Sequence, residues 1–175
     1  IGTISFAAKV DFAVGTTTSY PFIGDLDGDS KADLAVSNVA AASISTFRNT
    51  SVPGTISFAA KVDFTTGTTP YGLSMCDLDG DNKLDLITAN WIGNNISALR
   101  NTSVSGTISF AAKVDFAVTL TPHGIAAGDL DGDGRPDLVV TNTAPSNKIS
   151  VLINTSTTGA LSFAPKVDYA VTNNP

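Results

Sequence analysis

Hydrophobic residues recur along this chain in short runs, several of them with the alternating period that is typical of half-buried β-strands. Residues 2–12 alternate apolar with small or charged side chains. Two further runs flank an acidic block, at 21–24 and 34–37, and a fourth run lies at 43–48 after a turn. The run at 34–37 is apolar on both faces, which predicts an inner strand covered from both sides. The pattern therefore predicts groups of four short strands.

The same pattern is repeated three times. The segment GTISFAAKVDF stands unchanged at residues 2–12, 54–64 and 106–116, and a fourth copy, GALSFAPKVDY, lies at 159–169. An acidic block recurs in phase as DLDGDSKADL, DLDGDNKLDL and DLDGDGRPDL. The other predicted strands of the later units lie at 72–76, 86–89, 96–100, 124–128, 138–141 and 149–153. The chain therefore contains three full units and one surplus copy of the leading segment.

We expect a single repeat domain over residues 1–175. Its predicted parts are a surplus outer strand at 1–12, repeats at 13–64, 65–116 and 117–169, and a tail at 170–175. Four strands in a unit of this length are typical of a β-propeller blade. The predicted fold class is all-β, with three four-stranded antiparallel propeller-type blades in tandem plus one extra outer strand. Closed propellers need about four to eight blades, so we expect part of a larger propeller or repeat array.

Composition supports this fold class. All 16 acidic residues are Asp, and the chain has no Glu or Gln, which are good helix formers. The net charge of −6 argues against nucleic-acid binding, and no apolar run approaches the roughly 20 residues that cross a bilayer. The single cysteine, Cys76, is expected to be a small buried thiol. The sequence opens in mid-pattern without a signal peptide, as expected for a piece of a longer chain.

The acidic blocks predict metal sites. Each has the spacing Asp-x-Asp-Gly-Asp-x-x-x-Asp, and carboxylates this close repel by about 1–3 kcal/mol per pair. Oxygen ligands in a flexible loop favour Ca²⁺, so three ions per chain are expected. The predicted ligands are Asp25, Asp27, Asp29 and Asp33 in the first loop, Asp77, Asp79, Asp81 and Asp85 in the second, and Asp129, Asp131, Asp133 and Asp137 in the third.

The spacing is similar to the first half of an EF-hand loop, in which position 7 ligates through its backbone carbonyl. That position is Lys31, Lys83 or Arg135. Glycine at position 4 lets the backbone curl, as does the residue at position 6. Because Ser30 at position 6 tolerates positive φ least, we expect the first loop to be the weakest site. The alternative interpretation is a solvated acidic turn without a metal.

The block DLDGDGRPDL with its following apolar strand resembles the FG-GAP/VCBS-like calcium-binding β-propeller repeat family. The resemblance covers essentially the whole chain. It implies calcium-binding blades of a seven- or eight-bladed propeller, with the twelve Asp residues and three carbonyls above as ligands. The sequence lacks the Gly-Ala-Pro of FG-GAP repeats, because Ser37-Asn38-Val39 and its counterparts follow the inner strand. It is therefore closer to the VCBS-like branch, and integrin-type ligand binding is not implied.

Little in the sequence points to catalysis. The only histidine, His123, aligns with Tyr71 and Ser19 in the other units, so no repeated site contains it. Near-identical units disfavour the single asymmetric pocket of an enzyme, and we expect none. Trp91 lies in a turn, where it either packs within its own loop or stacks on a sugar. The repeated Lys-Val-Asp, as at Lys9 and Asp11, is expected to face solvent with ion pairs of little energetic value.

Asparagine acceptor motifs for glycans occur at four positions, three of them in phase. They are Asn49, Asn95, Asn101 and Asn154. In a glycosylating source the in-phase motifs predict an array of glycans on one rim. The alternative is a turn that is simply rich in Asn, Ser and Thr.

These observations predict a non-enzymatic, calcium-binding structural or adhesive repeat module of a secreted or cell-surface protein. One alternative is a building unit of an extracellular, glycan-coated filament, and another is a carbohydrate-binding propeller. The expected partners are further repeats of the same chain or identical subunits, together with glycans, with no nucleic acid and no membrane insertion. The extracellular location follows from the modest calcium affinity, about 10⁻⁴–10⁻³ M, expected of such loops.

Overall fold

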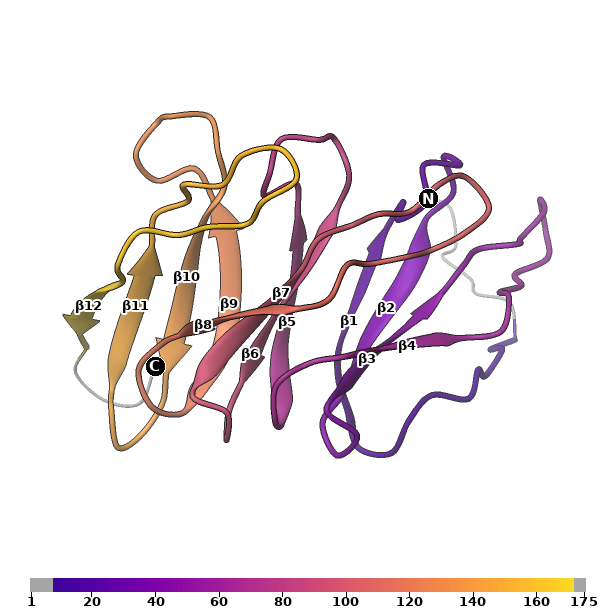
Figure 1. Cartoon of the computed structure of the whole chain (residues 1–175). Helices are drawn as coiled ribbons and strands as arrows, with labels where there is room; N and C mark the ends of the chain where they lie inside the picture. The colour runs from indigo at the N-terminus through magenta and orange to yellow at the C-terminus, as the bar shows by residue number, and fades with distance from the viewer. Residues whose placement is uncertain (1–7, 172–175) are drawn as a thin grey trace, which may run out of the picture.

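The computed structural model of the protein describes residues 8–171. These residues form twelve β-strands in three four-stranded antiparallel sheets that follow one another along the chain (Figure 1). Within the described range there is no helix that could span a membrane. The predicted all-β class and the three groups of four strands are confirmed.

Each sheet is made from one unit, and its strands are adjacent in chain order. The first sheet contains β1 (Thr18–Gly24), β2 (Asp33–Asn38), β3 (Ser43–Phe47) and β4 (Val62–Thr65). The second contains β5 (Pro70–Cys76), β6 (Asp85–Asn90), β7 (Asn95–Leu99) and β8 (Val114–Ala117). The third contains β9 (Pro122–Gly128), β10 (Asp137–Asn142), β11 (Lys148–Leu152) and β12 (Val167–Ala170). Each acidic block lies in the loop between the first and second strands of its sheet.

The outer segment forms a shorter strand than its alternating pattern predicted. Only Val62–Thr65 pairs with β3, whereas the residues before it form a hairpin arm held by isolated bridges such as Asn49 to Phe58. The chain reverses at Gly54, where φ is +84°, so the arm pairs with the residues just before it. Of the surplus copy, residues 8–12 are not in a strand, and the rest lies outside the described residues.

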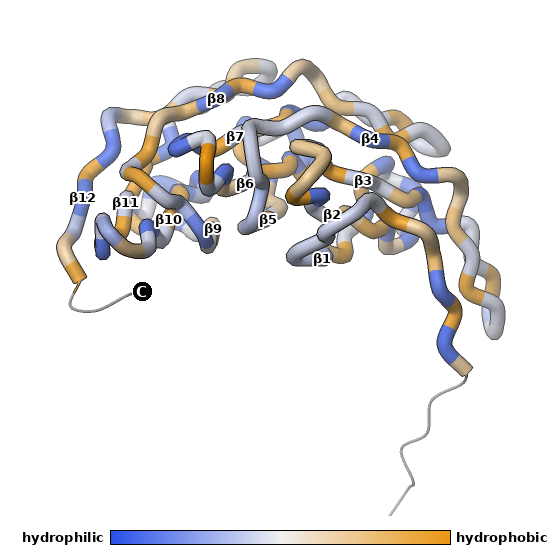
Figure 2. Tube along the Cα trace, turned by 90° about the horizontal axis from the view of Figure 1, so that it is seen from below, coloured by the Kyte–Doolittle hydropathy of each residue, from blue (hydrophilic) through white to orange (hydrophobic). Residues whose placement is uncertain are grey.

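The three sheets fan out along an open arc (Figure 2). The first strand of each sheet lies on the inner side of the arc, where β1 contacts β5 and β5 contacts β9. The fourth strands lie on the outer side (Figure 2). The sheets do not close into a ring in the described part of the chain, so a propeller arrangement stays a prediction.

Two apolar clusters fill the spaces between neighbouring sheets. Leu26 and Ile44 of the first unit pack with Leu86 of the second, and residues of β6 and β7 pack with Leu138 of the third. All six residues of β6 are buried because both faces of its sheet are covered. This confirms the predicted inner strand. The stability of each sheet therefore depends on its neighbours, as in other repeat proteins.

Candidate metal centre

The three acidic loops adopt the same curled backbone. In the first loop Gly28 has a φ of 76° and Ser30 a φ of 66°, and the equivalent residues of the other loops also have positive φ. The first Asp of the loop holds this turn, because Asp25 accepts backbone N–H groups from Gly28 and Ser30, both at 2.8 Å. Asp77 and Asp129 do the same in their loops. The predicted curl at positions 4 and 6 is confirmed.

The second Asp of the loop joins its unit to the next. Asp27 is 4% exposed, and its Oδ2 accepts the backbone N–H of Gly106 at 2.8 Å, from the hairpin between β7 and β8 of the second sheet. Asp79 makes the equivalent contact with Gly159 at 2.7 Å. Both hairpin glycines have a φ of +89°, which L side chains rarely adopt. The hairpin of one unit therefore closes the acidic loop of the unit before it.

The fourth Asp joins its loop to the hairpin of its own unit. Asp85 is fully buried, and its two carboxylate oxygens accept N–H groups from Leu78 at 2.9 Å and Asn101 at 2.7 Å. The pKa of Asp85 is raised to about 7. Burial is the largest cause, and the nearby acids Asp79 and Asp81 add to it, whereas the two hydrogen bonds partly offset the rise. A bound cation would lower the pKa of Asp85, because a nearby positive charge favours the charged carboxylate.

Three of the four predicted Asp ligands converge in each loop. Their oxygen atoms lie within 4.8 Å of one another. The groups are Asp25, Asp27 and Asp29; Asp77, Asp79 and Asp85; and Asp129, Asp131 and Asp137. A donor set of carboxylate oxygens alone fits a hard divalent cation and is compatible with calcium.

The remaining predicted ligands, Asp33, Asp81 and Asp133, lie outside these groups. Asp33 accepts N–H groups from Leu26 and Asn49, and Asp81 accepts that of Lys83. Their role as metal ligands stays a prediction.

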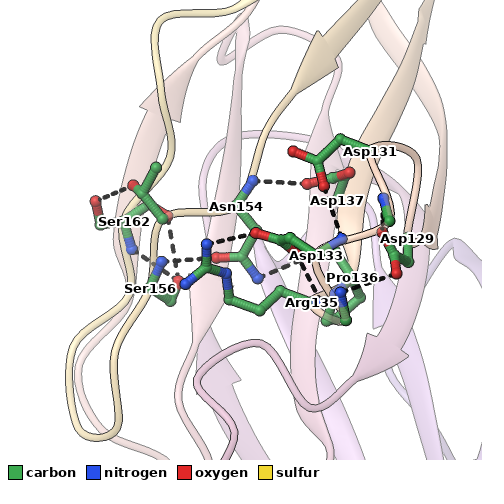
Figure 3. Close-up of polar contacts among 12 residues, drawn as sticks. Asp129, Asp131, Asp133, Arg135, Pro136, Asp137, Asn154, Ser156 and Ser162 are labelled. Atoms are coloured by element: carbon green, nitrogen blue, oxygen red, sulfur yellow. Dashed lines mark hydrogen bonds and ion pairs between the residues drawn. The ribbon is translucent and has the colours of Figure 1, made fainter.

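The basic residues at position 7 do not neutralise the first two clusters. Lys31 Nζ donates to the carbonyl of Ser51 at 3.4 Å, and Lys83 Nζ donates to that of Ser103 at 2.9 Å. Arg135 instead folds back onto Asp133 in the third loop (Figure 3). Carbonyl ligation at position 7 is not supported by these contacts, which involve the N–H groups and the side chains.

The predicted glycan array is wrong at two of its three in-phase positions. Asn101 and Asn154 are fully buried. The Nδ2 of Asn101 donates to the carbonyls of Leu26 and Leu84, both at 2.9 Å, and Asn154 binds two carbonyls in the same way. Figure 3 shows Asn154 between Asp137 and Pro136. A side-chain amide that joins two units is not accessible to a glycan, so Asn101 and Asn154 are structural.

A polar network in the middle of each sheet was not predicted from the sequence. Asn90 Nδ2 donates to Ser97 Oγ at 2.9 Å, and Ser97 Oγ donates to Asp115 Oδ1 at 2.6 Å. Asp115 also pairs with Lys113. The outer-strand Asp was predicted to face solvent only, and this was wrong in part. The in-phase recurrence of Asn, Ser and Asp was the available signal.

The same network lowers the pKa of the equivalent Asp in the third sheet. Burial alone would raise the pKa of Asp168, but hydrogen bonds from Lys166, Ser150 and Thr119 outweigh it and lower the pKa to about 2. The carboxylate is therefore held in its charged form.

Aromatic side chains from three units meet near the inner strands. Tyr71 stacks on His123 with ring centroids 4.9 Å apart, and Trp91 packs edge-on against Tyr71 at 5.3 Å. Tyr20 lies edge-on to His123 at 6.5 Å. Trp91 therefore packs on a neighbouring strand and not only within its own turn. Cys76 is half-buried, and burial raises the pKa of its thiol to about 12, as expected for an unreactive thiol.

Comparison with known proteins agrees with this repeat geometry. A search of curated protein sequences finds no match. The family of FG-GAP-like repeats matches the chain twice, over residues 25–88 and 77–140. Each match begins at the first Asp of an acidic loop and ends within the second strand of the next unit, so the family pattern spans the junctions described above. The two matches together cover residues 25–140, and the chain belongs to the FG-GAP-like repeat family.

Proposed function

We propose that this chain is a non-enzymatic structural or adhesive module that binds one Ca²⁺ ion in each acidic loop. The observation that carries this function is the position of the loops at the junctions between units. Asp27 and Asp79 each belong to a group of converging carboxylates and also bind the hairpin of the next unit. A cation in the loop would therefore stabilise both the loop itself and its contact with the hairpin of the next unit.

Electrostatics favours an occupied loop. The three converging carboxylates repel one another, and in the first two loops the lysine at position 7 donates to a carbonyl group instead of to these carboxylates. A cation that binds only the folded state raises stability by mass action. The role of the ion is therefore to make the loops rigid and the array of sheets stable, with no part in a chemical reaction.

The proposed setting is the outside of the cell. FG-GAP-like repeats are typical of extracellular and cell-surface proteins, which the family match supports. The loops have no Glu at position 12, so we expect affinities of about 10⁻⁴–10⁻³ M, which suit extracellular calcium. The open arc of sheets supports a sector of a propeller-like array whose partners are further units of the same kind (Figure 2).

Calorimetric titration with calcium tests this function. We expect about three ions per chain, and we expect the melting temperature to fall when EDTA removes them. Titration with Mg²⁺ is the control, because a loop of this flexibility should bind the smaller ion more weakly. The absence of calcium binding, or binding of about one ion per chain, would contradict the proposal.

Carbohydrate binding is a second candidate, and the aromatic group supports it. Tyr20 is 47% exposed and Trp91 is 38% exposed, and both lie beside the stacked pair of Tyr71 and His123. Exposed aromatic faces stack on sugar rings. Titration of neutral oligosaccharides should change the fluorescence of Trp91, the only tryptophan, and Tyr71→Ala should abolish the change. Tyr169→Ala, at an exposed tyrosine elsewhere, is the control. An unchanged spectrum in the wild type rejects this candidate.

A further inference from the structure

The third acidic loop differs from the first two in what covers it. Leu26 and Leu78, which follow the first Asp of their loops, are 1% and 0% exposed, whereas Leu130 is 56% exposed. Asp79 is 4% exposed, and its counterpart Asp131 is exposed. Within residues 8–171 no hairpin lies against the third loop. An apolar side chain and a hydrogen-bond acceptor are therefore left open at one end of the array.

The hairpin of the first unit exposes the surface that, in the other units, covers an acidic loop. Ile56 is 63% exposed, whereas its counterpart Ile108 is 8% exposed in the apolar cluster that contains Leu26. Asn49 is half-buried, while Asn101 is fully buried. The two hairpins have nearly the same sequence, NTSVPGTISF and NTSVSGTISF. The surface that covers an acidic loop inside the chain is therefore present, and uncovered, at the other end.

We propose that the third acidic loop is the docking site for the first hairpin, residues 49–58, of a second copy of this chain. The two internal junctions define the contacts. Asn49 Nδ2 donates to the carbonyl of Leu130, as Asn101 does to Leu26. Gly54 N–H donates to Asp131 Oδ2, as Gly106 does to Asp27, because Gly54 has the same positive φ. Ile56 covers Leu130.

The docked copies form a head-to-tail interface, because the two surfaces lie at opposite ends of the array of three described sheets. Such an interface leaves one free surface at each end of a dimer, so it continues to a closed ring or to an open fibre. Each added copy completes the acidic loop of the copy before it. The third loop thereby gains the burial that the first and second loops already have.

The outer strands must adjust when two copies dock. Phe12 packs edge-on against Phe58 at 5.0 Å, as Phe64 does against Phe110. The counterpart of Phe12 at the other end, Tyr169, is 57% exposed. Docking brings Tyr169 of one copy to the place held by residues 8–12 of the other. Residues 8–12 are the segment that is displaced, because their side chains are held more weakly. Lys9 and Asp11 have side chains 82% and 77% exposed, whereas Asp168, the counterpart of Asp11, accepts a hydrogen bond from Ser150.

This inference deepens the proposed structural role by naming the partner, and it depends on the repeat geometry and not on calcium. Loss of calcium binding with association retained would reject the metal sites alone. Three bound ions on a chain that stays monomeric would reject the docking surface alone. The two proposals are therefore tested by separate readouts.

Sedimentation velocity of the 175-residue chain over a range of concentrations tests the docking surface. We expect concentration-dependent association, and we expect Leu130→Arg and Ile56→Arg each to weaken it about tenfold or more, because each removes one buried apolar contact. The controls are Leu120→Arg and Ile92→Arg, which change side chains of similar exposure, 54% and 66%, in turns at the other ends of the strands. They should associate like the wild type.

Mixing the two interface variants gives the sharpest result. The Leu130→Arg chain keeps an intact hairpin and the Ile56→Arg chain keeps an intact loop, so an equimolar mixture should form a discrete dimer that does not grow. Circular dichroism of each variant checks that it is folded. A monomeric wild type, or equal weakening by the control variants, overturns the proposal, as does a mixture that stays monomeric.

Discussion

The second and third acidic loops have nearly the same sequence and very different surroundings. Both curl at position 4 with positive φ, and in both the first Asp accepts the same backbone N–H groups. In the second loop Leu78 is buried and Asp79 binds Gly159, whereas Leu130 in the third loop is exposed. The turn is therefore built by local residues, and its burial is supplied by the next unit. The prediction that the first loop, which contains Ser30, is the weakest metal site stays a prediction. The structure adds a second reason to expect unequal sites, because the third loop is the most exposed of the three.

The largest expected difference concerns the two leucines. Leu78→Ala should lower the free energy of unfolding by about 2–5 kcal/mol, because it leaves a cavity in the core between the second and third sheets. Leu130→Ala should change it by less than about 0.5 kcal/mol, as is usual for exposed positions. Urea unfolding of the chain at a concentration where it is monomeric measures both. Equal losses would contradict the comparison.

The hairpin asparagines should differ by a smaller amount. Asn101→Ala should cost about 2–3 kcal/mol, because two carbonyls in neighbouring units, one buried and one half-buried, lose their donor. Asn49→Ala should cost about 1 kcal/mol, since its Nδ2 has one carbonyl partner, that of Ala32, and the side chain is half-buried. Thermal unfolding of the two variants gives the difference. A milder effect at Asn101 than at Asn49 would reject the junction role.

The aspartates of the loops offer a calcium-dependent test. In excess calcium, Asp27→Ala should cost about 1.5–3 kcal/mol, more than Asp131→Ala, and Asp11→Ala should have the smallest effect. EDTA should narrow the gap between Asp27 and Asp11 without closing it, because the bond to Gly106 remains. Melting temperatures with and without calcium measure the gap. Identical values for the Asp27 and Asp131 variants would contradict the proposed junction.

The smallest effect is expected at the outer strand of the third sheet, where the pKa of Asp168 is lowered to about 2. A carboxyl group with a lowered folded-state pKa stabilises the fold above its unfolded pKa of about 4. That contribution, about 1 kcal/mol after solvent screening, should be lost as the pH falls from about 4 through 2. Asp168→Asn should remove this part of the pH dependence, whereas Asp11→Asn, at an exposed pair, should leave it intact. Acid titration followed by circular dichroism distinguishes the two variants.

The sequence by itself determined the repeat, the four strands of each unit and the curl of the acidic loops. These features depend on residues close in the chain: the alternation of apolar side chains, glycine at position 4, and an Asp that binds N–H groups three and five residues later. The tightly spaced carboxylates were visible for the same reason. Residues that are close in the sequence are also close in space within a short loop.

Tertiary structure decided which of these residues are buried and what they bind. Asn101 looked like a glycan acceptor, yet it binds a carbonyl 75 residues away, and Asp27 binds an N–H group 79 residues away. Residues 54–61 alternate like a strand, but the chain reversal at Gly54 pairs them with their own hairpin. Such contacts depend on how one sheet stacks on the next, because the space between two sheets is shaped by both units and only one of them is local in sequence.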